Sequence, residues 1–356
     1  PDWLDTQAPL LPRFLKQGGY ATAHFGKWHL ANNMIPDSPV PGEYGFDTYG
    51  AFNCAGEQMP VHEDSEHVVK FIQKSKAHGK PFFINMWLHE PHTPFHTVPK
   101  YRWRFRHLEN EADNIYASVL SHADDRVGEV LDELDRLEMT ENTLVIFSSD
   151  NGPARSSRPA ELGLMHDTAT GAGYNVAAAK GITGGRKGYK SSLFEGGIGV
   201  PFIARWPGKI PSGRVDKKSI LSAVDLLPTF CDVAGVELPN DYQPDGISQI
   251  NALMGNGMTM REKPLFWKFN SPWPPQTSRP HHWISYAVVE NQWKLVTNSD
   301  QSHVELYDLL SDPFEKKDLS QSSRSTVNHL TTTLNQWVST LPAKPTGNVF
   351  SSERFK

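Results

Sequence analysis

The stretch Gly19-Tyr-Ala-Thr-Ala-His-Phe-Gly-Lys-Trp-His-Leu30 predicts a short β-strand with basic side chains at its end. The β-prone run over residues 20–25 is followed by a glycine, which releases the backbone. Because side chains alternate along an extended chain, Lys27 and His29 should point the same way while Trp28 points into the protein. A cation and a titratable imidazole that project together suit an anionic substrate beside a proton carrier. The alternative is a surface lysine and a core histidine that only end a strand.

Length and composition are those of a globular protein. The chain has 356 residues, of which 38% are hydrophobic and 21% charged, enough for one large α/β domain and a smaller one. No run approaches the roughly 18 consecutive apolar residues of a membrane span. The net charge of −5 argues against general nucleic-acid binding. Cys54 and Cys231 are too few for a disulfide framework and lack metal-ligand spacing, so they either pair or stay free.

Helical and strand patterns alternate along most of the chain, as in a parallel α/β fold. The predicted strands cover residues 20–25, 82–87, 143–147 and 200–206, and the predicted helices cover residues 63–78, 111–138 and 222–233. The apolar runs at 82–87 and 143–147 are typical of strands buried on both faces. We expect a mostly parallel sheet sandwiched by helices over residues 1–245, and a smaller C-terminal α+β subdomain, an antiparallel sheet with one helix, over residues 246–356.

Polar residues follow the predicted strands at the edge where open parallel sheets bind ligands. Asp150 and Asn151 come directly after the run at 143–147. A carboxylate beside an amide oxygen suits a hard cation such as Ca²⁺ or Mg²⁺. An Asp-Asn-Gly turn is the alternative, because Asn-Gly is a strong turn signal.

A histidine-rich loop follows the predicted strand at 82–87. His89-Glu-Pro-His-Thr-Pro94 is not the His-Glu-x-x-His motif of zinc proteases, because its second histidine comes one residue early and a proline would break the required helix. Three zinc ligands from His89, His92 and His96 are another possibility. Prolines on both sides of His92 stiffen the loop and fix the direction of that side chain.

A glycine-rich cationic segment covers residues 184–190. It lacks the Gly-Lys-Ser/Thr order of a phosphate-binding loop, and the nearby Gly171-x-Gly lacks the third glycine of a dinucleotide fingerprint. The segment is therefore interpreted as a loop suited to closing over an anion. Lys190 stands five residues before Glu195, whereas Lys187 is expected to be a solvated neighbour.

Together these segments resemble the signatures of the type I, formylglycine-dependent sulfatases of the alkaline phosphatase superfamily. Their order along the chain matches the family. The matching segments are Gly-Tyr-x-Thr-x-x-x-Gly-Lys-Trp-His-Leu at 19–30 (Ala31 replaces the family's next glycine), Pro-His-x-Pro at 91–94, Asp-Asn at 150–151, Lys-x-x-x-x-Glu-Gly-Gly at 190–197 and Glu-Leu-Tyr-Asp-Leu-x-x-Asp-Pro-x-Glu at 305–315.

The resemblance implies a sulfatase fold and hydrolysis of a sulfate ester. Lys27 would hold the sulfate, and His29 would take the proton that drives sulfate release. His92 and Lys190 would contact the bridging oxygen and protonate or stabilise the leaving alcohol. A periplasmic or secreted location is also implied by the resemblance.

The resemblance further implies a Ca²⁺ ion, with Mg²⁺ as the alternative, and a formylglycine nucleophile made from a cysteine. Asp150 and Asn151 would supply half of the metal shell. Neither Cys54 nor Cys231 lies in the nucleophile signature Cys/Ser-x-Pro/Ala-x-Arg, and in the family the Lys-Trp-His signature lies well downstream of that motif. We therefore expect that the first strand and nucleophile helix are missing, and that the 356 residues alone are inactive on sulfate esters.

The missing strand would lie inside the sheet, next to the strand that leads to Asp150. An unpaired apolar edge would result, which is an association hazard. We expect poor solubility, self-association, or a requirement for a complementing N-terminal segment.

The substrate is expected to be a sulfated carbohydrate rather than a small aryl sulfate ester. In the segment 99–107, predicted as a loop, cations alternate with aromatics, and Arg102 and Arg104 could present a cationic, stacking face to a sulfated polysaccharide. The alternative is a structural loop with solvated arginines. Two other functions stay open: a non-catalytic sulfoglycan-binding homologue, and a phosphonate or phosphate monoester hydrolase of the same superfamily.

Overall fold

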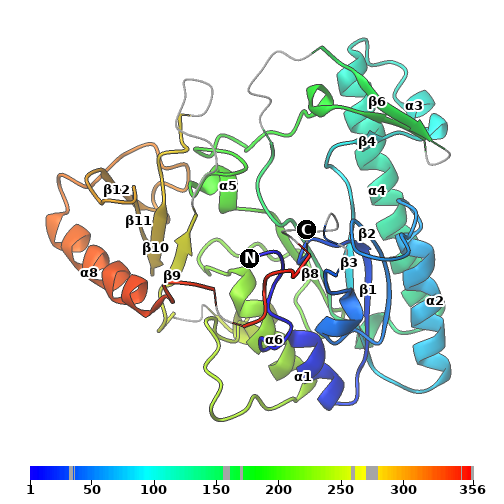
Figure 1. Cartoon of the computed structure of the whole chain (residues 1–356), viewed down its shortest axis with the longest axis horizontal. Helices are drawn as coiled ribbons and strands as arrows, with labels where there is room; N and C mark the ends of the chain where they lie inside the picture. The colour runs from blue at the N-terminus through cyan, green and yellow to red at the C-terminus, as the bar shows by residue number, and fades with distance from the viewer. Residues whose placement is uncertain are drawn as a thin grey trace.

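The computed structural model describes residues 1–31, 35, 37–154, 161–168, 171–257, 261–269, 280–345 and 347–353. Figure 1 shows a larger lobe and a smaller lobe, which the C-terminal strands form. The strands up to residue 257 are β1 (Ala21–Lys27), β2 (Thr48–Phe52), β3 (Phe82–Trp87), β4 (Phe95–His96), β5 (Val145–Ser148), β6 (Leu164–Thr168), β7 (Gly171–Tyr174) and β8 (Phe202–Arg205). The helices in that part are α1 (Leu11–Gln17), α2 (Asp64–Ala77), α3 (Pro99–Arg104), α4 (Glu111–Arg136), α5 (Glu195–Ile198), α6 (Leu226–Ala234) and α7 (Ile250–Met254). The smaller lobe contains β9 (Leu265–Lys268), β10 (Tyr286–Glu290), β11 (Trp293–Thr297), β12 (Val304–Asp308) and helix α8 (Arg324–Thr340).

The predicted parallel sheet is confirmed in the order β2-β1-β3, with both pairings parallel. Helices α2 and α4 cover one face, and α1 and α6 lie on the other side (Figure 1). The alternation of β1 explains this division: Ala23 and Phe25 pack into the core with α2 and α4. Trp28, just past the strand, belongs to the core cluster of the opposite face. The carboxyl ends of the three strands point to the top of Figure 1.

Strands β5 and β8 form a separate antiparallel pair. Among the described strands, β3 pairs only with β1, and β5 pairs only with β8. The prediction that both apolar runs are buried on both faces is wrong: every residue of β3 is partly exposed, and Phe147 of β5 is 45% exposed. An apolar run reports the preference of its side chains, whereas burial depends on which strands and helices lie beside it.

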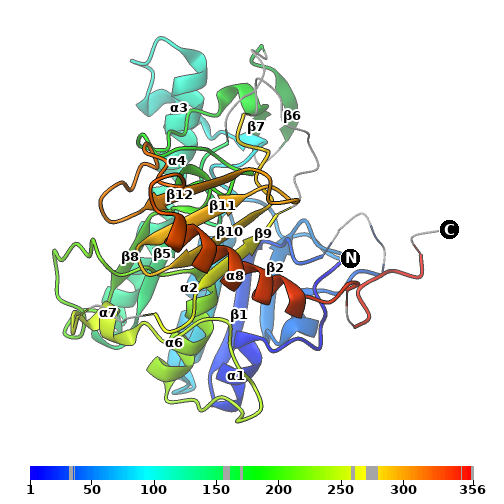
Figure 2. The ribbon, with the colours of Figure 1, turned by 90° about the vertical axis from the view of Figure 1, so that its left-hand side faces the viewer.

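The smaller lobe confirms the expected antiparallel sheet with one helix. Its order is β12-β11-β10-β9, and α8 crosses one face of it (Figure 2). Val288, Leu295 and Leu306 pack beneath α8, while the opposite face packs on the segment that contains Phe194. The boundary at residue 245 stays a prediction.

Two local predictions are wrong. Residues 99–104 form helix α3 rather than a loop, because Pro99 stands at the first helical position, where proline is favoured. Successive positions on a helix turn by about 100°, so alternate arginines and aromatics do not share one face. Lys187 is not a solvated neighbour: its Nζ lies 2.8 Å from Glu305 Oε2 and from Tyr307 Oη, and it joins the two lobes.

Two findings concern features that the sequence left open. Cys54 and Cys231 are both buried free thiols. In the described part of the chain, no helix combines the length and apolar character needed to cross a membrane.

Candidate active site

The basic residues after β1 are positioned by a close approach of two strands. Gly26 has φ +110°, and a Cβ at this position would lie 2.0 Å from the carbonyl oxygen of Trp87 on β3. Only glycine fits there. Past this point Trp28 is fully buried, whereas Lys27 is half-buried and His29 is exposed, as the alternation predicts.

Buried His24 holds the end of β1, a role that the sequence analysis missed. Its Nε2 donates to the carbonyl oxygen of Lys27 at 3.0 Å, and its Nδ1 accepts from Asn85 Nδ2 at 3.3 Å. Burial lowers the pKa of His24 to about 4, so the ring is neutral at pH 7 and can serve both bonds. The sequence contains the signal for a buried His24, because the alternation of side chains that turns Trp28 inward also turns His24 inward.

The histidine loop after β3 directs two imidazoles differently. His92 Nδ1 lies 2.7 Å from the carbonyl oxygen of Thr93, which can only accept, so Nδ1 carries the proton. This leaves Nε2 as the nitrogen available to a substrate. His89 instead donates from Nε2 to the carbonyl oxygen of Pro94 at 2.9 Å and folds back onto its own loop.

A buried ion network fixes this loop to the helices. Arg126 of α4, only 2% exposed, pairs with Glu90 in the loop and with Asp64 at the start of α2. Neither carboxylate is accessible to water. The sequence analysis also missed this role, because Glu90 and Arg126 lie 36 residues apart and carry no motif of their own.

Asp150 and Asn151 lie directly after β5, as predicted. The Asp150 carboxylate is exposed and forms no hydrogen bond with the other residues that the structure describes. Asn151 Nδ2 donates to the carbonyl oxygen of Gly152 at 3.0 Å, which leaves the amide oxygen free to bind a cation. The pair therefore fits a hard ion such as Ca²⁺, but supplies two of the roughly six to eight oxygens that Ca²⁺ takes.

The segment after Lys190 is folded tightly against the loop that contains Asp150. The backbone N–H of Lys190 donates to Pro153 at 3.0 Å, and that of Gly152 donates to Gly197 at 2.8 Å. A Cβ on Gly152 would lie 1.9 Å from the oxygen of Gly196, so this approach requires glycine. The two segments thus bring Lys190 beside the end of β5.

Electrostatics show that the predicted basic residues share one neighbourhood. Burial lowers the pKa of Lys27, and Lys190 lowers it further while Asp150 opposes the shift. The pKa of His29 is lowered by burial and then by Lys27 and Lys190, again opposed by Asp150. For His92, burial and the same two lysines also lower the pKa. Five residues from four segments therefore interact at the carboxyl edge of the sheet.

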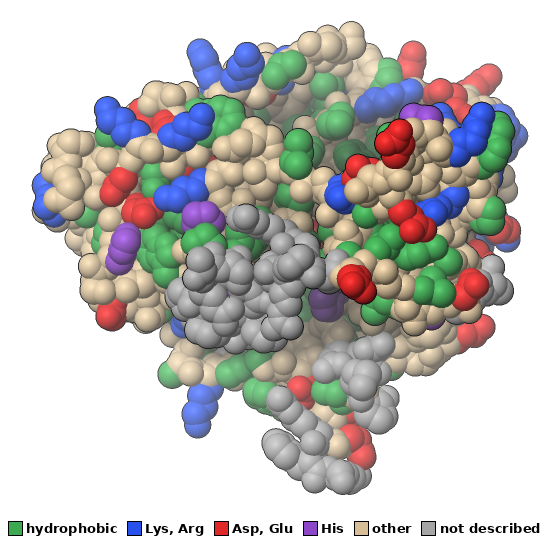
Figure 3. All heavy atoms as spheres, turned by 90° about the horizontal axis from the view of Figure 1, so that it is seen from above, with side chains coloured by type: hydrophobic (Ala, Val, Ile, Leu, Met, Phe, Trp, Pro, Cys, Tyr) green, Lys and Arg blue, Asp and Glu red, His purple; other side chains and the backbone are tan. Residues whose placement is uncertain are grey.

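The molecule is hollowed at this edge. Figure 3 looks down on the carboxyl ends of the strands and shows a recess between the lobe with β9–β12 and the lobe with α4. A site there opens to solvent between the lobes.

Arg102 and Arg104 lie apart from this group on α3. Arg102 pairs with Glu111 at 3.2 Å, and Arg104 bonds Ser121 at 2.9 Å and lies 3.9 Å from Asp125. Their guanidinium groups are thus partly neutralised by α4. None of the pKa shifts of the basic group is attributed to either arginine.

The sequence leaves open a zinc site formed by His89, His92 and His96. Within the described ranges, the group close enough to hold a metal ion is a different one, His62, Glu90 and His122.

Comparisons with known proteins agree with this geometry. The family model described as "Sulfatase" matches residues 4–236, and one described as "N-sulphoglucosamine sulphohydrolase, C-terminal" matches residues 186–343. The chain is 27% identical to the N-acetylgalactosamine-6-sulfatase of Canis lupus familiaris over 402 aligned residues, which cover 96% of this chain and 71% of that protein. It is 24% identical to an uncharacterized sulfatase of Escherichia coli (strain K12), YdeN, with 99% of this chain and 70% of that protein covered.

Among solved structures, Ps i-CgsB in complex with k-i-k-neocarrahexaose has the same fold. The TM-score is 0.73 at 23% identity, and the match covers 94% of this chain and 75% of that one.

Proposed function

Because the chain belongs to the sulfatase family, we propose that its basic site binds the sulfate group of a sulfated carbohydrate and serves sulfate ester hydrolysis. One observation carries the proposal: Lys27, His29, His92 and Lys190 gather beside Asp150 and share one electrostatic field. Bringing the cations of Lys27 and Lys190 together is unfavourable unless an anion offsets their repulsion. The carbohydrate class follows the names of the sulfatase from Canis lupus familiaris and of the complex with k-i-k-neocarrahexaose.

In the proposed roles, the lysines neutralise sulfate oxygens. Lys27 and Lys190 approach from different segments, so a sulfate between them would be held from two sides. Charge builds up on these oxygens when the ester bond breaks, and preorganised cations stabilise that charge.

The histidines would move protons. The lowered pKa values keep His29 and His92 neutral at pH 7, so each has a nitrogen that can accept a proton. His92 presents Nε2, because Nδ1 is bound to Thr93. Nε2 is therefore the atom that would exchange a proton with the bridging oxygen of the ester.

Sulfatases generally use Ca²⁺ and formylglycine. Asp150 and the amide oxygen of Asn151 would hold the ion, which supplies a positive charge to the sulfate oxygens when it is bound. Neither Cys54 nor Cys231 has the sequence around it that formylglycine formation requires, and both are buried. The 356 residues should therefore bind sulfate esters without hydrolysing them.

Calorimetric titration with a sulfated galactosaminoglycan oligosaccharide in Ca²⁺ buffer tests the proposal. We expect saturable binding that Lys190→Ala or Lys27→Ala weakens by about tenfold or more, since a charge-assisted hydrogen bond is worth about 1.5–3 kcal/mol. Lys317→Ala, at an exposed position of the tail, is the matched control and should bind as the parent does. No binding, or equal loss in all three variants, would contradict the proposal. A matched phosphate monoester that binds more tightly would favour the phosphate hydrolase alternative.

The non-catalytic binding function has a test of its own. If Arg102→Ala and Arg104→Ala abolish binding of the oligosaccharide while Lys190→Ala leaves it unchanged, glycan recognition resides on α3. If Lys190→Ala weakens binding while Arg102→Ala and Arg104→Ala leave it unchanged, recognition resides in the basic site.

A further inference from the structure

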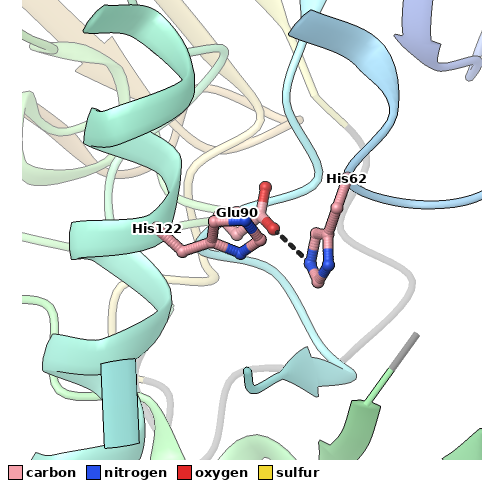
Figure 4. A group of neighbouring side chains, drawn as sticks. All are labelled: His62, Glu90 and His122. Atoms are coloured by element: carbon pink, nitrogen blue, oxygen red, sulfur yellow. Dashed lines mark ion pairs between the residues drawn. The ribbon is translucent and has the colours of Figure 1, made fainter. Parts of the chain in front are cut away.

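Three side chains from separate segments meet beneath the histidine loop (Figure 4). His62 precedes α2, Glu90 lies in the loop after β3, and His122 belongs to α4. One nitrogen or oxygen from each lies within 4.8 Å of the others. Glu90 is buried, and the two histidines are half-buried.

His62 Nε2 and Glu90 Oε1 form an ion pair at 2.9 Å, which Figure 4 marks with a dashed line. Neither atom forms a further hydrogen bond with another described residue. His122 Nδ1 is also buried without a partner among the described residues. Buried polar atoms are normally paired, so an unpaired imidazole nitrogen beside this ion pair indicates a ligand.

We propose that His62, Glu90 and His122 form a binding site for a divalent transition-metal ion, with Zn²⁺ as its preferred occupant. Two imidazoles and one carboxylate are a ligand set that zinc takes in proteins. The set is poor for Ca²⁺, which prefers oxygens only. Ligand atoms around a tetrahedral Zn²⁺ stand about 3.3 Å apart, given bond lengths of about 2.0–2.1 Å. The 2.9 Å between His62 Nε2 and Glu90 Oε1 is close to this value, and the ligand atoms of the three residues all lie within 4.8 Å of one another, so they can converge on one ion.

The surroundings support a metal ion. Glu90 Oε2 already pairs with Arg126, which orients the carboxylate and leaves Oε1 for the metal. Asp64 compensates the charge of Arg126 from the other side. His96 is a further imidazole nearby, with its ring centre 5.9 Å from that of His62 and its Nδ1 unpartnered in the described structure.

This site differs from the proposed calcium site in position and ligand type. It joins the loop of His92 to α4 and to the segment before α2. A bound ion would therefore brace the loop that presents His92 Nε2 to the substrate. The metal site itself does not depend on the sulfatase proposal, because its ligands are not the residues that would bind sulfate.

Metal titrations of the full 356-residue chain test the proposal. After treatment with a chelator, we expect one Zn²⁺ or Co²⁺ per chain, an absorption spectrum of Co²⁺ with four or five ligands, and a higher melting temperature with Zn²⁺ than with Ca²⁺. His122→Gln and His62→Gln should each weaken Zn²⁺ binding by about 10–100-fold or more, at least the loss seen for weaker second-shell contacts. His329→Gln, an exposed histidine of α8 paired with Glu290, is the matched control and should leave binding unchanged.

Absence of a bound ion, or equal binding by parent and both ligand variants, would overturn the proposal. If either variant fails to fold, the other one and the Co²⁺ spectrum of the unchanged protein still decide. If the unchanged protein binds Zn²⁺ but does not bind sulfate, the proposed function is contradicted and the metal site is still supported.

Discussion

Substitution of Lys294 by methionine should strongly destabilise the protein. Lys294 is fully buried on β11, with its Nζ 2.7 Å from Glu195 Oε1 and 2.9 Å from Glu315 Oε1. Burial opposes its charge, but the two carboxylates more than offset this and raise the pKa of Lys294. Methionine fills a similar volume and removes the charge, which leaves Glu315 buried without a counterion.

The expected loss is about 3 kcal/mol at pH 8, at the lower end of the roughly 3–5 kcal/mol found when one partner of a buried ion pair is removed. The lower end applies because Glu315 Oε2 still accepts the backbone N–H of Glu195 at 2.7 Å. Burial already raises the pKa of Glu315, and removal of Lys294 raises it further. A carboxyl whose folded-state pKa lies above its unfolded value destabilises the fold as pH rises through that pKa. The loss should therefore be smaller at pH 5 than at pH 8.

Urea unfolding followed by circular dichroism at both pH values measures this loss. Lys70→Met is the matched control, because Lys70 forms an exposed pair with Glu66, and it should change stability little. The double variant Lys294→Met/Glu315→Gln should recover much of the loss, since the unpaired charge is gone. A loss below about 1 kcal/mol for Lys294→Met, the range of surface pairs, would refute the reasoning.

Three further predictions follow from the described residues. Inorganic sulfate should bind more tightly as pH falls below about 6.5, the ordinary pKa of histidine, because the pKa values of His29 and His92 are lowered from it and a bound anion favours their charged forms; calorimetry showing a flat or opposite trend would contradict the site. His24→Gln should flatten the loss of stability between pH 6.5 and about 4, where His24 contributes about 1.4 kcal/mol per pH unit to the loss in the parent because the unfolded state takes up the proton first; equal slopes for both proteins in acid unfolding would count against it. The chain should self-associate through the free edges of β3 and β5, and Phe147→Lys with Ile203→Lys should reduce this; a concentration-independent monomer in sedimentation velocity would disprove it.

The sequence predicts the elements of this fold better than their environments. The strand at 82–87 has the bounds of β3, because proline precedes it and its apolar run is continuous. Its partial exposure was not predictable, since the residues beside a strand come from distant segments. Helix α3 could have been predicted from Pro99 at its start, had the alternation of arginines and aromatics not been interpreted as an extended loop.

In the candidate site too, local features are predictable from the sequence and their surroundings are not. Lys27, His92, Asp150 and Lys190 could be predicted as site residues because each stands in a local motif that resembles a family signature. The buried residues that support the loops, Glu90 with Arg126 and Glu195 with Lys294, were not assigned that role. Their partners lie far along the chain, and a single charged residue in a sequence does not reveal its partner. Local motifs thus indicate which groups belong to the candidate site, whereas tertiary structure is needed to see what holds them.

These buried networks explain why the two halves of the site are rigid. A buried ion pair adds little net stability compared with apolar residues of the same volume, so stability alone does not account for the four carboxylates of the two networks. Each network instead lies behind one segment of the candidate site. Glu90 anchors the loop of His92 to α4 through Arg126, and Glu195 anchors the segment of Lys190 to the smaller lobe through Lys294. Because a buried charge tolerates few positions of its partner, each pair fixes its segment within a narrow range. The two lysines, whose charges repel each other, and the two histidines are therefore held together before any anion arrives.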